Sequence, residues 1–223
     1  MQSVDSSIIH YGVFMTERVR SIQKDISIQK KILLSVLIFV LGICLGIGSK
    51  ALDLTAVNEL PYIVQILDIT NFLGRFAIWI FIAACISVYS ISPKRAALNV
   101  LLFFVGMVSS YYLYSTIVGG FFPKTYAMIW TGITVISPFL AYVCWYAKGN
   151  GRVAIIISGV ITGVLFSQAF LLFQGIRITY ITEVTVWLVS LWLFRRKPKE
   201  FIYEMAISLA VAVLVQLFIP YWG

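Results

Sequence analysis

Long apolar runs separated by short polar segments dominate this chain. A helix needs about 20 mainly apolar residues to cross the roughly 30 Å hydrocarbon core of a bilayer, and seven of the runs approach or reach this length. The pattern therefore predicts an all-α fold, a polytopic transmembrane helical bundle of about seven helices. The predicted spans are residues 32–49, 72–92, 96–118, 125–147, 153–174, 178–194 and 200–219.

Residues 32–223 are predicted to form one seven-helix transmembrane domain, because the spans use most of that length. Most connections are short, which makes sequential helices antiparallel neighbours. Residues 1–31 mix apolar and charged positions, and we expect a cytoplasmic tail or an amphipathic helix on the inner membrane surface. Residues 54–70 are predicted to be an outer loop with an interfacial or re-entrant helical piece.

The distribution of lysine and arginine predicts the orientation of the bundle. Cytoplasmic segments of membrane proteins hold an excess of these residues, and here most of them lie in the tail and in residues 94–95, 148–152 and 195–199. This places the N-terminus in the cytoplasm and the C-terminus outside, in the inner (plasma) membrane of a cell. The net charge of +8 is then a topology signal facing anionic lipid, and no nucleic-acid partner is expected.

Composition excludes several classes of function. The chain is 61% hydrophobic and 12% charged, whereas about a quarter of the residues in soluble domains are charged, so the lipid bilayer is its main partner. Cys44, Cys85 and Cys144 lie inside apolar runs and His10 is the single histidine; we therefore expect no disulfide, no metal site and no cofactor. No nucleotide-binding or hydrolase motif occurs, and an enzyme is not expected.

Charged side chains toward the outer ends of the spans are the first candidate binding residues, because an ionisable group costs about 2.5 to 3.5 kcal/mol at the centre of a membrane helix. Asp68, Asn71 and Arg75 recur at i, i+3 and i+7, and share one face if their helix starts before Asp68. Arg75 is suited to hold a carboxylate or phosphate. Glu183 lies more than a turn inside a short span. The alternative is that these charges end helices at the membrane surface and pair with one another.

Hydroxyl groups are dense in residues 109–116, and we expect this face of the third span, including Ser110 and Tyr112, to line the same outer cavity. An aromatic belt at the membrane interface explains part of this run. Gln168, in the middle of the fifth span, is a further candidate; its alternative is a hydrogen bond between helices. The remaining motifs concern packing: Ser137–Pro138 predicts a kink, and Gly42-x-x-x-Gly46 and Gly159-x-x-x-Gly163 predict close helix approach.

Three stretches of the chain carry a resemblance to known proteins. They are Gly46–Asp53; Ser92–Asn99 with Tyr111–Tyr114; and Phe121–Tyr126 with Ser137–Phe139 and Cys144–Gly149. Together they resemble a family of bacterial, mostly Firmicute-type, multi-pass membrane proteins with a domain of unknown function, over roughly residues 40–190. The resemblance implies a bacterial inner-membrane protein and supplies no substrate, cofactor or catalytic residue.

Two functions stay open at this point. The first is a permease, or the substrate-binding membrane subunit of a transporter, for a small polar or zwitterionic solute bound in the outer cavity. The second is a non-transporting accessory or sensory protein that binds a partner subunit or a lipid through its cytoplasmic face and tail. A deep cavity favours the first function, whereas a lipid-tight bundle favours the second.

Overall fold

The computed structural model describes residues 19–22, 26–173, 177–178 and 180–218, and these are mainly helical, as the pattern predicts. A short hairpin pairs β1 (Phe170–Leu171) with β2 (Arg177–Ile178) antiparallel. Residues 1–18, which include most of the predicted tail and His10, lie outside the described residues. The longer helices are α2 (Ile28–Leu54), α5 (Phe76–Tyr89), α6 (Pro93–Ile117), α7 (Lys124–Cys144), α8 (Gly151–Ala169), α9 (Ile181–Leu193) and α10 (Pro198–Phe218).

Five of the described helices are long and apolar enough to cross a membrane: α2, α6, α7 with its continuation η2 (Trp145–Lys148), α8 and α10. Helices α5 and α9 are apolar but have 14 and 13 residues, which gives each a length of only about 20 Å. The helices inside the predicted spans at 72–92 and 178–194 are therefore shorter than those spans. Both helices begin late because the backbone is extended at their N-caps, Arg75 and Tyr180.

The predicted loop at 54–70 contains short helical pieces, as expected. They are η1 (Val57–Glu59), α3 (Tyr62–Ile66) and α4 (Ile69–Gly74). Asp68 precedes α4 in the left-handed conformation, with φ of 51°, which is uncommon outside glycine but is tolerated best by Asp and Asn. The chain therefore turns sharply at Asp68 before α4 begins.

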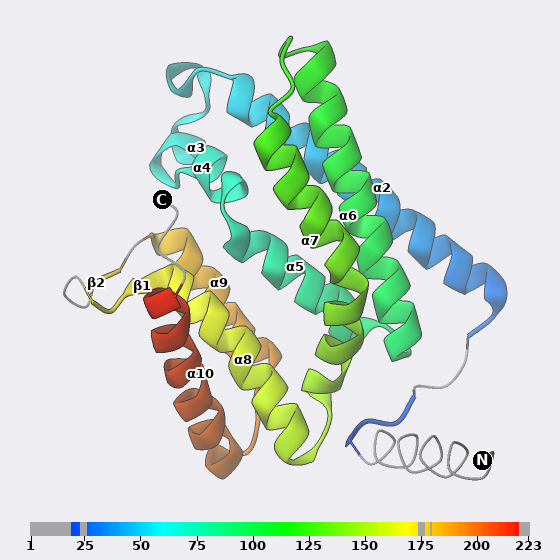
Figure 1. Ribbon diagram of the computed structural model, residues 1–223, viewed down its shortest axis with the longest axis vertical. Helices are drawn as coiled ribbons and strands as arrows, with labels where there is room; N and C mark the ends of the chain where they lie inside the picture. Colours follow the sequence, from blue (N-terminus) through cyan, green and yellow to red (C-terminus); the bar gives the residue numbers. More distant parts are fainter. Residues whose placement is uncertain (1–18, 23–25, 174–176, 179, 219–223) are drawn as a thin grey trace.

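Helix α5 lies between two groups of helices, with α2, α6 and α7 on one side and α8, α9 and α10 on the other (Figure 1). Its side chains take part in all three buried hydrophobic clusters. Trp79 packs with Phe103 of α6, Val88 packs with Phe194 after α9, and Ala77 packs with Val186 of α9. The short helix therefore joins the two groups.

Small residues set the closest helix contacts, as the glycine motifs predict. Helix α2 packs on α6 and α8 packs on α10. A Cβ atom added at Gly106 of α6 would lie 2.6 Å from the backbone oxygen of Phe39, and one at Gly163 would lie 2.6 Å from that of Ser208. Both distances are shorter than van der Waals contact, so each crossing requires a residue without a side chain.

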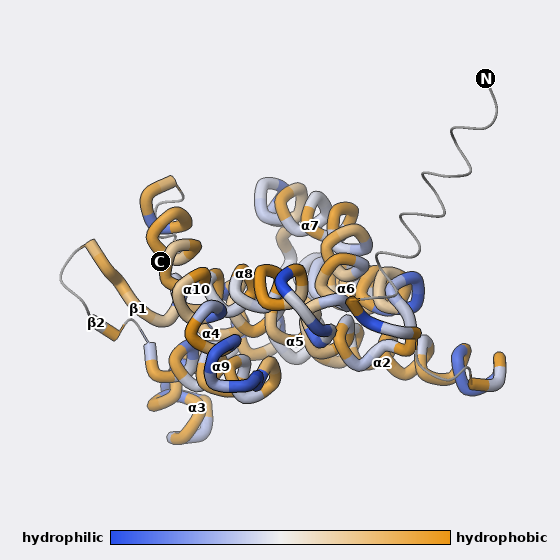
Figure 2. The backbone as a smooth tube through the Cα atoms, turned by 90° about the horizontal axis from the view of Figure 1, so that it is seen from below, coloured by the Kyte–Doolittle hydropathy of each residue, from blue (hydrophilic) through white to orange (hydrophobic). Residues whose placement is uncertain are grey.

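Large apolar side chains cover the outside of the bundle, including Leu33, Leu37 and Val40 of α2. Figure 2, which views the bundle from below, shows mainly hydrophobic helices with the strongly hydrophilic stretches at their ends. A helix that is apolar on its exposed face needs lipid as its solvent. Pro138 lies inside α7 and has no N–H, so the backbone oxygen of Thr134 lacks its usual helical donor. Ser137 Oγ donates to that oxygen instead (2.8 Å).

Candidate functional site

Three of the predicted site residues meet in one ion-pair cluster, defined here as the Arg75 cluster of Arg75, Asp68 and Glu183. Arg75 Nε donates to Glu183 Oε1, and Arg75 Nη1 lies 3.3 Å from Asp68 Oδ2. Asn71, the fourth predicted residue of this group, donates from Nδ2 to Asp68 Oδ1 (2.7 Å). The cluster connects the junction between α4 and α5 to the first turn of α9.

The carboxylate of Glu183 is the most deeply buried member of the Arg75 cluster, with 1% of its side chain exposed against 13% for Arg75 and 38% for Asp68. Thr182 Oγ1 donates to Glu183 Oε2 (2.7 Å), and the Arg75 guanidinium lies 3.8 Å from the centre of the Tyr180 ring. Two carboxylates and one aromatic ring therefore surround the Arg75 guanidinium.

The helix-face explanation for this cluster is wrong, although the side chains do meet. Asp68 lies before α4, and Arg75 is the extended residue between α4 and α5. A single helix therefore does not hold Asp68, Asn71 and Arg75 in register. The left-handed turn at Asp68 and the break at Arg75 bring them together. Two carboxylates of the protein already pair with Arg75, so its positive charge is compensated within the protein.

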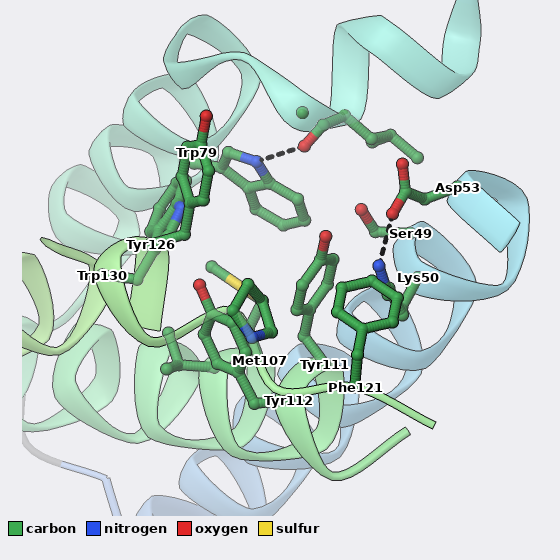
Figure 3. Close-up of a pocket in the computed structure, with 14 residues that line it drawn as sticks. Ser49, Lys50, Asp53, Trp79, Met107, Tyr111, Tyr112, Phe121, Tyr126 and Trp130 are labelled. Carbon is green, nitrogen blue, oxygen red and sulfur yellow. Dashed lines mark hydrogen bonds and ion pairs between the residues drawn. The ribbon is translucent and has the colours of Figure 1, made fainter. Parts of the chain in front are cut away.

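A cavity of about 320 Å³ lies beside this cluster, between α2, α4, α5, α6 and α7. Ser49, Lys50 and Asp53 of α2 form one end, and Trp79, Tyr126 and Trp130 form the other (Figure 3). We refer to it as the Lys50 cavity. Its size is near the lower limit for small-molecule pockets, about 300 to 1,000 Å³. The cavity is therefore suited to one small molecule with a charged end and an apolar end.

Lys50 supplies a buried positive charge at the polar end. Its side chain is 3% exposed, and Nζ lies 2.5 Å from Asp53 Oδ2, whose side chain is 48% exposed. The ammonium group also lies 4.6 Å from the centre of the Phe121 ring and 5.2 Å from that of Tyr111. Such ring faces attract cations. One carboxylate and two aromatic rings thus hold the Lys50 charge next to the cavity.

The aromatic end is held rigid by contacts among its own rings. Trp79 and Trp130 meet edge to face with ring centroids 6.3 Å apart, and Phe76 stacks on Trp130 at 5.2 Å. Trp79 Nε1 donates to the backbone oxygen of Leu73 (2.8 Å). The break at Arg75 interrupts the helical hydrogen bonding around this carbonyl, so the indole compensates for the break and fixes its own orientation.

Of the other predicted residues, Tyr112 lines the Lys50 cavity, whereas Ser110 and Gln168 do not. Ser110 is buried where α6 crosses α2, and its Oγ lies 3.1 Å from the backbone oxygens of both Ile43 and Met107, either of which can accept its proton. Gln168 is partly buried in α8. Among the described residues, no three His, Cys, Asp or Glu side chains form a group that could hold a metal ion.

The prediction missed Lys50 and the two tryptophans as cavity residues. Lys50 and Asp53 were recognisable in the sequence as an i, i+3 pair at the end of the first apolar run. Their burial was not recognisable, because it depends on Phe121 and Tyr111 covering the ammonium. Trp79 and Trp130 gave no separate signal, since tryptophan is common at membrane interfaces without any binding role.

The opposite end of the bundle carries three arginines that bind backbone oxygens. Arg20 donates to Trp145 O (2.5 Å) and Val88 O (2.8 Å), and burial lowers the pKa of its guanidinium. Arg196 donates to Gly149 O (3.2 Å) and pairs with Glu204. Arg95 donates to the backbone oxygen of Lys31 and to Ser35 Oγ. These arginines fasten the ends of helices at this face.

The chain belongs to DUF6518, a family of unknown function, which matches residues 69–221. This confirms the resemblance to a family without an assigned function. The family match lies further toward the C-terminus than the predicted resemblance over residues 40–190. It omits residues 40–68 and includes the last helix. Lys50 and Asp53 therefore lie outside the matched region, whereas Trp79, Tyr126 and Trp130 lie inside it. No significant match was found among the curated proteins or the solved structures.

Proposed function

We propose that this protein is a membrane permease, or the substrate-binding membrane subunit of a transporter, and that it binds a small zwitterionic solute in the Lys50 cavity. The observation that carries the proposal is a buried ammonium group at one end of a cavity whose other end is aromatic. Charged groups within membrane helices are costly and usually mark a substrate or ion pathway. In this proposal a solute inside the cavity meets the Lys50 charge.

The interruption between α4 and α5 supports the same proposal. Leu73 and Gly74, the last residues of α4, line the cavity, and Arg75 ends the helical backbone beside it. Transporters commonly build their binding sites at broken membrane helices, where irregular backbone lines a cavity. Helices α4 and α5 together would form such a broken span, which explains why α5 alone is short.

We further propose that the chain crosses the membrane seven times, with the N-terminus inside and the C-terminus outside. The short helices α5 and α9 then cross with help from the segments next to them. The basic residues Arg20, Arg95 and Arg196 belong to the end opposite the Lys50 cavity. By the positive-inside rule that end faces the cytoplasm, and the cavity accepts solute from outside.

Movement would follow from the division of the bundle into two groups. The Arg75 cluster ties α5 to α9 beside the cavity, and Arg20 ties α5 to η2 at the other end. In this mechanism the group of α2, α6 and α7 tilts against the group of α8, α9 and α10, and the breaks at Arg75 and Pro138 absorb the change in backbone angle.

A thermal-stability screen of the detergent-purified protein tests the proposal. The compounds are amino acids, betaines, polyamines, sugars and nucleosides, and the variants are Lys50→Met and, as a matched control, Lys124→Met, whose lysine is exposed at the same end. A ligand at 100 times its Kd adds about 2.7 kcal/mol to the stability of the folded state. We expect a zwitterion to raise the melting temperature of the wild type and of Lys124→Met, and not that of Lys50→Met.

The alternative function, an accessory or sensory protein, is favoured by a different observation. Residues 19–22 are fastened to the bundle, since Arg20 binds Trp145 O and Val88 O, and Val19 O accepts from Asn150 N (2.7 Å). A signal arriving at the tail would therefore reach α5 directly. If anionic lipid alone raises the melting temperature, and Arg20→Met rather than Lys50→Met removes the effect, this alternative replaces the permease.

A further inference from the structure

Resting on the proposed function, we infer that the solute is an α-amino acid with an apolar or aromatic side chain, bound in one orientation. Its carboxylate meets Lys50, its ammonium group meets Asp53, and its side chain lies between Trp79, Tyr126 and Trp130. The inference names the chemical class that the Lys50 cavity recognises, and it depends on the arrangement of charge and rings in Figure 3.

Both charges of the polar end come from one helix turn. Lys50 and Asp53 are three residues apart on α2, and Nζ lies 2.5 Å from Oδ2. An α-amino acid carries its ammonium and carboxylate on the same carbon, so both can meet Lys50 and Asp53 side by side. The complex then replaces one ion pair by two and adds no net charge to a poorly hydrated site, which limits the desolvation cost.

The other end selects the side chain of the solute. Trp79, Tyr126 and Trp130 present ring surfaces, and Met107 contributes an adaptable thioether beside them. The indole N–H of Trp79 is already engaged by Leu73 O (2.8 Å), so that indole offers its apolar ring rather than a donor. Apolar or aromatic groups gain from burial against such surfaces, whereas a charged side chain would lose its hydration there.

A betaine is the nearest competing class, because aromatic rings also attract quaternary ammonium groups. Its methylated nitrogen has no N–H to donate, so it cannot replace the contact that Asp53 makes with Lys50. Once the solute carboxylate has bound Lys50, a betaine leaves Asp53 facing a cation that donates no hydrogen bond to it. The Lys50–Asp53 pair therefore favours the α-amino acid, and the two classes differ in a measurable way.

Isothermal titration calorimetry on the detergent-purified protein distinguishes these cases. The probes are L-phenylalanine, phenethylamine without the carboxylate, 3-phenylpropionate without the ammonium group, and glycine betaine. We expect L-phenylalanine to bind, and each truncated analogue to bind at least tenfold more weakly, because each leaves a charged partner unsatisfied. These comparisons use the wild type, so they do not depend on the folding of a variant.

Two variants test the orientation. Lys50→Met should remove the preference for L-phenylalanine over phenethylamine, and Asp53→Asn should remove the preference over 3-phenylpropionate, while Lys124→Met keeps both. If glycine betaine binds more tightly than L-phenylalanine and Lys50→Met abolishes its binding, the inferred class is wrong and the proposed function stands. If no probe binds and no compound in the thermal screen depends on Lys50, both are wrong.

Discussion

Arg75 and Lys50 lie at the same end of the bundle but differ in what surrounds their charges. Arg75 binds two carboxylates, one of them the buried Glu183, and its guanidinium stacks on Tyr180. Lys50 has one carboxylate partner that is half exposed, and its ammonium borders a cavity. We therefore propose a structural role for Arg75 and a solute-binding role for Lys50.

A double-mutant cycle separates these roles at the residue scale. Arg75→Met leaves Glu183 buried without its cation, and unfolding in mixed micelles should show a loss of about 3 kcal/mol or more. Glu183→Met should also destabilise the protein, but the double variant should cost clearly less than the sum, because no unpaired buried charge remains. If the two losses in unfolding free energy were additive, the Arg75–Glu183 pair would be contradicted. The folded Arg75→Met protein should still bind the solute, because Arg75 has a structural role.

Prediction from the sequence selected Asp68, Asn71, Arg75 and Glu183 as solute-binding residues for their charge and position, and the structure brings them together as partners of one another. It failed where burial decides the role. Whether Lys50 is solvated or enclosed depends on Phe121, which reaches it from a connection more than 70 residues later in the chain.

At the scale of elements, glycines determine how closely α2 and α6 approach. A Cβ atom on Gly42 would collide with the backbone oxygen of Phe103, whereas one on Gly48 of the same helix would meet nothing within 4 Å. The two positions therefore form a matched pair. Both substitutions by alanine raise helix propensity, by up to about 1 kcal/mol, but only one of them disturbs the crossing.

We expect Gly42→Ala to lower the free energy of unfolding by about 1 to 3 kcal/mol, the usual cost of overpacking a tight contact. Gly48→Ala should leave it unchanged or slightly higher. The measurement is unfolding of both variants in the same detergent mixture. Equal stability of the two variants would mean that α2 and α6 do not cross at Gly42.

Element boundaries show where apolar patterning stops being informative. Helices α6 and α8 begin at Pro93 and Gly151, and proline and glycine are plain boundary signals in the sequence. The break at Arg75 was not predicted, because Gly74 and Arg75 lie inside the run assigned to one span over residues 72–92. Arg75 leaves the helix where it contacts Asp68, Glu183 and Tyr180, and two of these contacts come from a distant part of the chain.

At the scale of the whole molecule, the proposed orientation can be tested with single cysteines. Cys44, Cys85 and Cys144 are replaced by alanine, and Lys124→Cys or Lys197→Cys is added at an exposed position. A membrane-impermeant maleimide applied to intact cells should label Lys124→Cys directly and Lys197→Cys only after permeabilisation. The reverse pattern would show that the Lys50 cavity opens toward the cytoplasm.

The central claim of this account is that the Lys50 cavity serves transport of a small zwitterion, namely an α-amino acid with an apolar or aromatic side chain. Uptake of radiolabelled L-phenylalanine into proteoliposomes preloaded with the unlabelled amino acid tests it most directly, with Lys124→Met as the matched control and Lys50→Met as the critical variant. We predict saturable uptake by the wild type and Lys124→Met, reduced at least tenfold in Lys50→Met. Uptake no faster than in protein-free liposomes, or equal uptake by Lys50→Met, would contradict the claim.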